Sequence, residues 1–364
     1  MKSVIIPYRQ ENHGDFDAEW PVQRKVTGWW YITGYFSDPA DPAHLYSYQF
    51  TLARPRIFGI YPWLLHLALT DVQARGHYFT QRLTFSHPDV YVTGDSAHIK
   101  SLAHLKREAG RMILTTNTDT FDLNLTLDKG KGATWHADDG VLVMGGAEDL
   151  RRRTVYYSYT NLPTAGEVSL HDPQGDRKTM QVTGKSWFDR QWGPYALTKV
   201  NTHWEWFSLR FFDDEEVMLF AFPQCPYYDG TYITREGKRA LVRNYTCTPK
   251  HFVEVNGVKF SMGWDLVMPG VKEEKYEIRP LTEGQMNLYY FELLAGIYNP
   301  AGEQVGLCMV ELLPGARNSQ DAVNPLNMLK EVRLARHSSG TPPDGSRLPD
   351  RPLCQMEANR HSGK

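Results

Sequence analysis

Apolar and polar residues alternate with a period of two along much of this sequence. In the segment FDLNLTL, residues 121–127, every second residue is apolar. Such alternation over four to eight residues is typical of a strand with one face in a core. Residues 253–255 and 258–260 repeat the pattern on either side of Asn256-Gly257, the dipeptide of a tight hairpin turn. The pattern predicts antiparallel strands joined by short turns.

Further apolar runs follow one another with polar or Gly/Pro-bearing turns between them. HWEWFSLRFF and VMLFAF are separated by DDEE, and the closing segment LLAGIYNPAGEQVGLCMVEL has the same organisation. A meander of strands is therefore expected. Helical spacing occurs in two places. Residues 96–112 have apolar residues near every third or fourth position after Asp95, which suits a helix cap, and residues 325–337 have a similar pattern.

Length and composition extend this prediction to the whole chain. The 364 residues exceed what one hydrophobic core usually serves, so two packed units are expected. Ten Trp, twenty Tyr and sixteen Phe make up 13% of the chain, and aromatic residues favour strands. We predict an all-β fold of two consecutive antiparallel barrels with few short helices. The first would span residues 1–193 and the second residues 194–337, with a flexible polar tail at 338–364.

Charge and motif content exclude several classes of partner and cofactor. Forty Lys and Arg against 42 Asp and Glu give a net charge of −2, which provides no field for nucleic acid. The longest mainly apolar run, residues 57–69, is too short for a membrane span. The N-terminus lacks the apolar core of a secretory signal, so a cytoplasmic location is expected. The four Cys form no C-x-x-C pair, and no nucleotide-binding glycine motif occurs. We expect neither a metal nor a cofactor.

The densest group of chemically distinctive residues is GKSWFDRQWG, residues 184–193. In an extended segment Trp187, Asp189 and Gln191 point to one face, and Arg190 points to the other. If the Asp189 face lines an apolar chamber, loss of hydration favours the neutral acid, and Asp189 becomes a candidate proton donor. The alternative is a buried structural carboxylate that binds backbone amides or an arginine where two domains meet.

A second group follows at HWEW. His203 and Glu205 share one face of the expected strand, and Trp204 and Trp206 share the other. The His/Glu pair has the chemistry to exchange protons or bind a metal, although a half-buried structural histidine is the alternative. Aromatic residues elsewhere either pack in a core or line a pocket and stabilise a developing positive charge. These are Trp30, within WWY, and Tyr157, within YY. Polar residues in apolar surroundings are expected to pair when buried; they are His66, Asp71, Arg82, Glu292 and Glu311.

Several segments, taken in order, resemble one known family. These segments are WWYITGYF, HLALTD, FDLNLTL, YYSYTNLPTAGEV, GKSWFDRQWG, HWEWFSLRF and VGLCMVEL. Their order is similar to that in the lipocalin-like carotenoid 1,2-hydratases (hydroxyneurosporene synthases), a family that includes AttH-like proteins, kievitone hydratase and fungal Diels–Alderases. The resemblance covers residues 27–313. It implies two lipocalin-like barrels with a pocket for an apolar substrate between or within them.

The resemblance also assigns residues. The family's functional aspartate falls on Asp189 and its neighbouring aromatic residue on Trp187, while a family His and Trp match His203 and Trp204. Relatives commonly carry Asp-His-x-Trp-Gly, where this chain has Asp189-Arg190-Gln191-Trp192-Gly193. Arginine does not cycle a proton near neutral pH, so this change removes the support for a histidine relay. A role for arginine in charge stabilisation or in binding a substrate carbonyl is compatible with it.

The leading functional hypothesis is an enzyme acting on an apolar unsaturated terpenoid, carotenoid or polyketide-like molecule by acid-promoted hydration, cyclisation or isomerisation. Asp189 and His203 would be catalytic. The expected substrate-binding residues are Trp30, Tyr157, Trp187, Arg190, Trp192, Trp204 and Trp206. The rival hypothesis is a carrier or sensor that binds a lipophilic molecule unchanged. A third is a metal-dependent hydrolase that uses His203 and Glu205.

Overall fold

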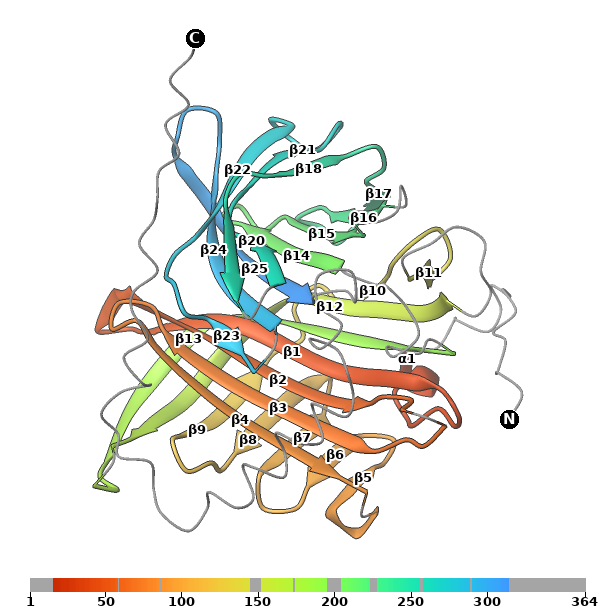
Figure 1. The fold of residues 1–364 in the computed structure, drawn as a ribbon, viewed down its shortest axis with the longest axis vertical. Helices are drawn as coiled ribbons and strands as arrows, with labels where there is room; N and C mark the ends of the chain where they lie inside the picture. The colour runs from red at the N-terminus through yellow and green to blue at the C-terminus, as the bar shows by residue number, and fades with distance from the viewer. Residues whose placement is uncertain are drawn as a thin grey trace.

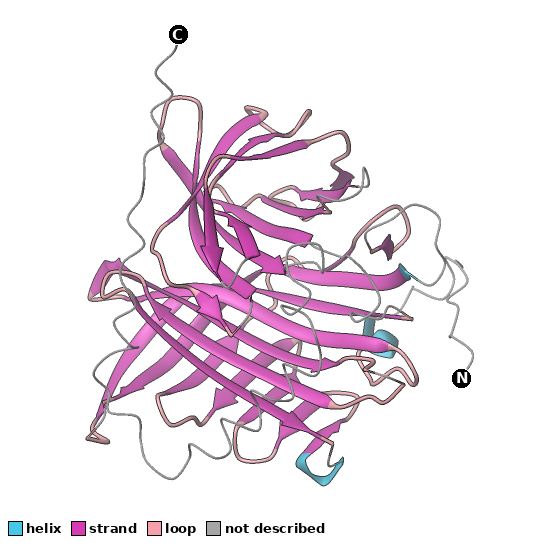
Figure 2. Cartoon of the chain, in the orientation of Figure 1, coloured by secondary structure: helices cyan, strands magenta, loops and turns pink. Residues whose placement is uncertain are grey.

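Strands account for nearly all the regular structure of this protein (Figure 2). The computed structural model describes residues 16–57, 59–85, 87–144, 152–172, 174–194, 204–222, 228–255, 258–288 and 290–313. Among these residues helix is confined to short turns such as α1 (Phe16–Glu19) and the 3-10 turn η2 (His87–Asp89). The all-β, two-barrel fold expected from the sequence is confirmed.

The first sheet is antiparallel and curls around its own core in the lower half of Figure 1. Its strands, in hydrogen-bonded order, are β4 (Gly76–Thr84), β3 (Trp63–Asp71), β2 (Asp41–Arg54), β1 (Thr27–Asp38), β13 (Arg177–Gly193), β12 (Arg153–His171), β9 (Phe121–Leu127), β8 (Arg111–Thr116), β7 (Ala103–Glu108), β6 (Ser96–Ile99) and β5 (Val90–Val92). Two short strands, β10 (Ala133–Trp135) and β11 (Val141–Val143), pair with β12.

The second sheet curls in the same way in the upper half of Figure 1. Its order is β17 (Arg239–Leu241), β16 (Tyr228–Ile233), β15 (Glu216–Ala221), β14 (Trp204–Phe211), β25 (Gln304–Leu313), β24 (Tyr290–Tyr298), β22 (Lys275–Pro280), β21 (Trp264–Val267) and β18 (Thr246–Pro249), with β23 (Met286–Asn287) beside β24. The hairpin predicted around Asn256-Gly257 is confirmed: β19 (Phe252–Val255) pairs with β20 (Val258–Ser261), and Val255 lies opposite Val258.

The helix predicted over residues 96–112 is wrong, because this segment forms β6, β7 and the start of β8. The buried residues follow a period of two, as in Ala103 and Leu105, rather than a helical period. Ala109 and Gly110 both adopt positive φ, which makes the tight turn that joins β7 to β8. The second predicted helix, 325–337, and the tail at 338–364 lie outside the described residues.

Three apolar cores organise the molecule. One lies inside the first sheet and includes Trp30 and Phe188, and another lies inside the second sheet and includes Phe207. A third core joins the two sheets and includes Trp187 and Trp206. Strands β13 and β14 therefore contribute side chains to two cores each, because alternate residues of a strand face opposite sides.

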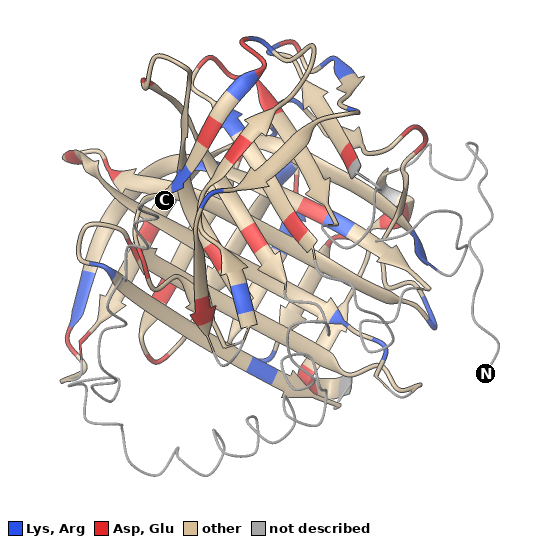
Figure 3. Cartoon of the chain, turned by 45° about the horizontal axis from the view of Figure 1, so that its top comes forward, with Lys and Arg blue, Asp and Glu red and all other residues tan. Residues whose placement is uncertain are grey.

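Charged residues of both signs are mixed over both sheets (Figure 3). None of the helices in the described ranges is long and apolar enough to cross a bilayer. The last strand of the first sheet ends at Gly193, and the first strand of the second begins at Trp204. The division of the chain into two independently folding domains at this point stays a prediction.

Candidate functional site

The central strand β13 directs Asp189 and Gln191 to the space between the sheets. Asp189 lies opposite Tyr31 of β1 on one side and opposite Ser158 of β12 on the other. Residues directly opposite each other in a ladder share a face. Trp187 on this face belongs to the core between the sheets, whereas Phe188 belongs to the core inside the first sheet. The two faces of β13 therefore differ chemically, as the sequence predicts.

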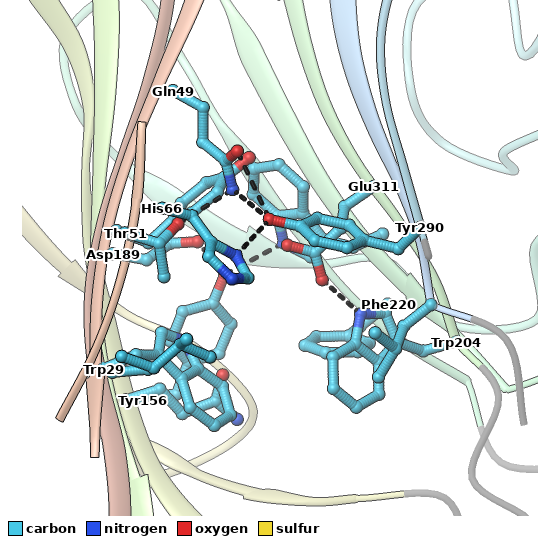
Figure 4. A pocket seen from close by; sticks show the side chains of 16 residues that line it. Trp29, Gln49, Thr51, His66, Tyr156, Asp189, Trp204, Phe220, Tyr290 and Glu311 are labelled. Atoms are coloured by element: carbon cyan, nitrogen blue, oxygen red, sulfur yellow. Dashed lines mark hydrogen bonds between the residues drawn. The ribbon is translucent and has the colours of Figure 1, made fainter. Parts of the chain in front are cut away.

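A pocket lies where the two sheets meet. It contains about 720 Å³ of space free of protein atoms, including its opening to solvent. The first sheet contributes Trp29, Tyr31, Gln49, Thr51, Ala53, Leu64, His66, Tyr156, Asp189 and Gln191, and the second contributes Trp204, Trp206, Phe220, Tyr290, Glu311 and Leu313. Figure 4 shows Asp189, His66 and Trp29 on one wall and Glu311, Tyr290 and Trp204 on the other. A mostly apolar concave site with a few convergent polar groups is typical of small-molecule binding.

Asp189 is the acidic group of the first wall and is only 4% exposed. Its Oδ2 accepts a hydrogen bond from the Tyr156 hydroxyl at 3.0 Å, and its Oδ1 accepts bonds from Trp187 Nε1 at 2.6 Å and from the Ser158 hydroxyl. Burial raises the pKa of Asp189 to about 7, although these three donors lower it. Both protonation states are therefore populated near neutral pH. None of the salt bridges among the described residues involves Asp189.

A hydrogen-bonded chain continues behind Asp189 into the second sheet. The Ser158 hydroxyl donates to Asp189, so it accepts from His136, whose Nε2 lies 2.6 Å away. His136 Nδ1 lies 2.9 Å from the hydroxyl of Thr231 on β16, and that hydroxyl is the donor because Nε2 carries the proton. Burial lowers the pKa of His136 to about 3, which keeps the ring neutral. The chain holds Ser158 with its proton directed at Asp189.

The second wall carries a pair of glutamates. Glu292 of β24 and Glu311 of β25 lie directly opposite each other in the ladder, and their side chains hydrogen bond. Glu292 accepts bonds from the Tyr31 hydroxyl at 2.9 Å and from Gln49 Nε2 at 2.8 Å. Glu311 accepts one from Trp204 Nε1 at 2.5 Å. Thus groups from both sheets hold the pair.

Electrostatics place a proton on this pair. Burial, together with the charge of Glu311, raises the pKa of Glu292 well above its usual range. Burial also raises the pKa of Glu311, while the hydrogen bonds from Trp204 and Glu292 lower it. Two adjacent carboxyl groups without a cation cannot both ionise readily, and no described Lys or Arg forms a salt bridge with either. Glu292 therefore holds the proton and donates it to Glu311.

Uncharged polar groups of the two walls hydrogen bond to one another. The Tyr290 hydroxyl lies 2.9 Å from His66 Nδ1 and 2.9 Å from Gln49 Nε2, as Figure 4 shows. Burial lowers the pKa of His66 to about 3, so the imidazole is uncharged. The pocket thus presents carboxyl, phenol, amide and neutral imidazole groups among its aromatic rings.

The residues predicted from the sequence separate into two groups. Asp189, Trp204 and Trp206 line the pocket together, and Trp187 packs directly behind Asp189. Four other expected ligand contacts point away from the pocket, since they lie on the opposite face of their strands: Trp30, Tyr157, Arg190 and Trp192.

Arg190 illustrates how the side chains of this group are engaged outside the pocket. Its guanidinium donates to the backbone carbonyls of Trp20, Pro21, Trp29 and Gln191 and lies 4.1 Å from the ring centroid of Trp30. It is therefore engaged by the protein itself and is directed away from any substrate in the pocket. Likewise, Trp192 Nε1 donates to Glu19 at 2.8 Å.

The residues predicted at HWEW differ in where the structure places them. His203 lies outside the described residues. Glu205 points into the core of the second sheet, where it accepts hydrogen bonds from Ser261 at 2.6 Å and Trp264 at 2.9 Å. It therefore lies on the opposite face of β14 from the pocket-lining Trp204 and Trp206. The metal-site hypothesis receives no support from Glu205 in this position.

Several site residues were missed by the sequence analysis. Ser158 and His136 carry no recognisable motif, because only the fold brings them to the Asp189 side of the pocket. Tyr31 and Tyr156 lie within the aromatic segments WWY and YY, whose orientation the sequence left open. Glu292 and Glu311 were noted as polar residues in apolar segments, but their register is not visible in the sequence. The available signal was burial of a carboxyl within a strand, which predicts pairing without naming the partner.

Comparisons with known proteins agree with this architecture. The AttH-like family model matches residues 15–315. A crystal structure of an AttH from Nitrosomonas europaea aligns with a TM-score of 0.70 at 18% identity, covering 82% of this chain and 96% of that chain. Kievitone hydratase from Nectria haematococca aligns with a TM-score of 0.66 at 16% identity, covering 82% of this chain and 92% of that one. No curated protein matches the sequence significantly.

Proposed function

The chain belongs to the AttH-like family, and on this premise we propose that it is an enzyme that protonates an apolar, unsaturated small molecule in the pocket between its sheets. Asp189 is the proton donor. The observation that carries this proposal is a pocket-lining carboxyl, 4% exposed, whose pKa is raised to about 7 by burial. A general acid works best when its pKa lies near the operating pH.

The surroundings of Asp189 suit the charge that protonation creates. A proton added to one carbon of a double bond leaves positive charge on its neighbour, and aromatic faces stabilise such charge. Trp29, Trp204 and Trp206 supply indole rings to the pocket. Trp187, Tyr156 and Ser158 then stabilise the carboxylate that remains, because each donates a hydrogen bond to it. The cation is resolved by water, by a second double bond or by loss of another proton.

These outcomes correspond to hydration, cyclisation and isomerisation. The structural relative from Nectria haematococca is named a hydratase, which supports hydration as the first reaction to test. Terpenoid, carotenoid or polyketide-like molecules have the apolar, unsaturated character that the lining residues favour.

An aryl vinyl ether tests the acid without knowledge of the natural substrate. Protonation of the terminal carbon of 2-naphthyl vinyl ether, followed by water addition, gives 2-naphthol and acetaldehyde, and naphthol fluorescence reports the rate. We expect the Asp189→Asn variant to fold and to bind the probe while turnover falls about 10²- to 10⁴-fold. Glu205→Gln is the matched control, since Glu205 is a buried carboxyl outside the pocket, and it should retain turnover.

The same experiment separates the enzyme from a carrier. Quenching of tryptophan fluorescence measures probe binding independently of turnover. Binding by the wild-type protein without any naphthol release above background would favour the carrier. Equal turnover by wild type and Asp189→Asn would remove Asp189 from the mechanism.

A further inference from the structure

The pocket contains a second acidic side chain that has no role in the proton donation by Asp189. Glu311 lines the pocket from the second sheet, and its charge contributes to the raised pKa of Asp189 from across the pocket. Figure 4 shows the two side chains coming from opposite walls. A hydration reaction needs both a donor of a proton to carbon and an acceptor of a proton from water.

We propose that Glu311, held in place by Glu292, is the proton acceptor of this site, so that each sheet supplies one carboxyl group to the reaction. The inference rests on the proposed function, whose acid is Asp189. It adds water as the second reactant and assigns the group that activates it. Glu311 is thus a catalytic residue, and Glu292 is a positioning residue that acts through it.

The contacts of the pair suit these two roles. Glu292 is 3% exposed and is fixed by Tyr31 and Gln49 behind the pocket wall. Glu311 is more exposed than Glu292 and contacts the pocket directly. The proton held by Glu292 and the Trp204 N–H both point at Glu311, so they stabilise its ionised form. A carboxylate that is partly desolvated and firmly held is a stronger base than one in water.

Protons and bonds balance over one hydration cycle. Asp189 gives its proton to one carbon of the double bond, the π bond is consumed, and a C–H bond forms. The oxygen of water bonds to the other carbon while Glu311 takes one of the water protons. Asp189 is left ionised and Glu311 protonated. A proton returns from Glu311 to Asp189 through water that enters the pocket after product leaves.

Other buried carboxyl groups do not fit this role. Glu216 forms a salt bridge with Lys131 at 2.9 Å and accepts from Asn161, so its charge is already compensated. Glu205 faces the core of the second sheet. Neither lines the pocket. Besides Asp189, the carboxyl group that lines the pocket is that of Glu311, so the Glu292–Glu311 pair is the one positioned to meet water beside a substrate.

A base-specific probe tests Glu311 separately from Asp189. Ring opening of 5-nitrobenzisoxazole requires a base to take the proton on C3 while the N–O bond breaks, which gives the coloured 2-cyano-4-nitrophenolate. We expect the wild-type protein to accelerate this reaction and Glu311→Gln to reduce kcat at least 100-fold with little change in KM. Glu292→Gln should reduce kcat less, because it removes a positioning group only. Glu205→Gln should match wild type.

The two probes distinguish the two proposals. Loss of 5-nitrobenzisoxazole ring opening in Glu311→Gln, with Asp189→Asn retaining it, supports Glu311 as the base. Loss in Asp189→Asn with retention in Glu311→Gln overturns the inference, as does a wild-type rate equal to that of free acetate. Either result leaves the acid proposal to be decided by naphthyl vinyl ether turnover. Conversely, an Asp189→Asn variant fully active on the vinyl ether defeats the proposed function without affecting the ring-opening result.

Discussion

The protonation state of Asp189 results from two opposing effects at a single residue. Burial favours the neutral acid, whereas the donors Ser158, Trp187 and Tyr156 favour the carboxylate. The raised pKa shows that burial prevails. The Ser158 donor depends in turn on His136, because the imidazole N–H occupies the acceptor side of the hydroxyl and leaves its proton for Asp189. A residue without pocket contact thereby sets the strength of the acid.

Removing the Ser158 hydroxyl should make Asp189 a weaker acid. In Ser158→Ala the pKa of Asp189 should rise, because a donor that lowers it is lost. The alkaline limb of the pH profile for naphthyl vinyl ether turnover should therefore move to higher pH. Unfolding free energy should fall by about 1–3 kcal/mol, since His136 Nε2 loses its acceptor. Ser261→Ala is the control, because it removes the equivalent donor from Glu205. A limb that stays in place would contradict the role of Ser158.

At the scale of elements, β13 performs a different task on each face. One face supplies Asp189 to the pocket, and the other uses Arg190 to bind the backbone carbonyls that precede β1. Arg190→Met should lower the unfolding free energy by about 2–4 kcal/mol, because buried carbonyls lose their donors. Vinyl ether turnover per folded molecule should change less than about twofold. Arg82→Met serves as the control, since Arg82 is half-exposed and lies 3.8 Å from Asp89. A large loss of turnover in Arg190→Met would place its guanidinium in the mechanism.

Period-two patterning made some elements predictable and left others ambiguous. Strand β9 was predictable because four buried apolar residues alternate with polar ones over its whole length. The two faces of β13 were predictable for the same reason. The segment 96–112 was misread because its strands are only four to six residues long. In such short strands a few apolar residues fit either period, and the turn at Ala109-Gly110 decides the outcome.

At the scale of the whole molecule, the site exists only where the two sheets meet. Its acid comes from β13, its glutamate pair from β24 and β25, and the histidine behind it bonds to Thr231 of β16. Sequence patterns located Asp189 and the two tryptophans of β14, because local spacing defines the face of a strand. They did not place Glu311 across the pocket from Asp189, since that arrangement depends on how one sheet packs on the other. Pairing between distant segments carries no local signal.

The free energy of unfolding of the whole chain should depend on pH because Asp189 retains its proton when folded. Its pKa is about 7 in the folded protein, whereas the ordinary value of 3.8 applies to the unfolded chain. Between these two pH values the folded chain therefore binds more protons than the unfolded chain. Stability from this group is therefore lost as pH rises from about 4 to about 7 and is constant above.

Asp189→Asn abolishes this loss. Urea denaturation should show the difference in unfolding free energy, variant minus wild type, rising by about 3 kcal/mol between pH 5 and pH 8. His66 and His136, whose pKa values burial lowers to about 3, act in the opposite direction but equally in both proteins. A difference independent of pH would mean that Asp189 is already ionised when folded, and a carboxylate without a proton near neutral pH cannot be the donor.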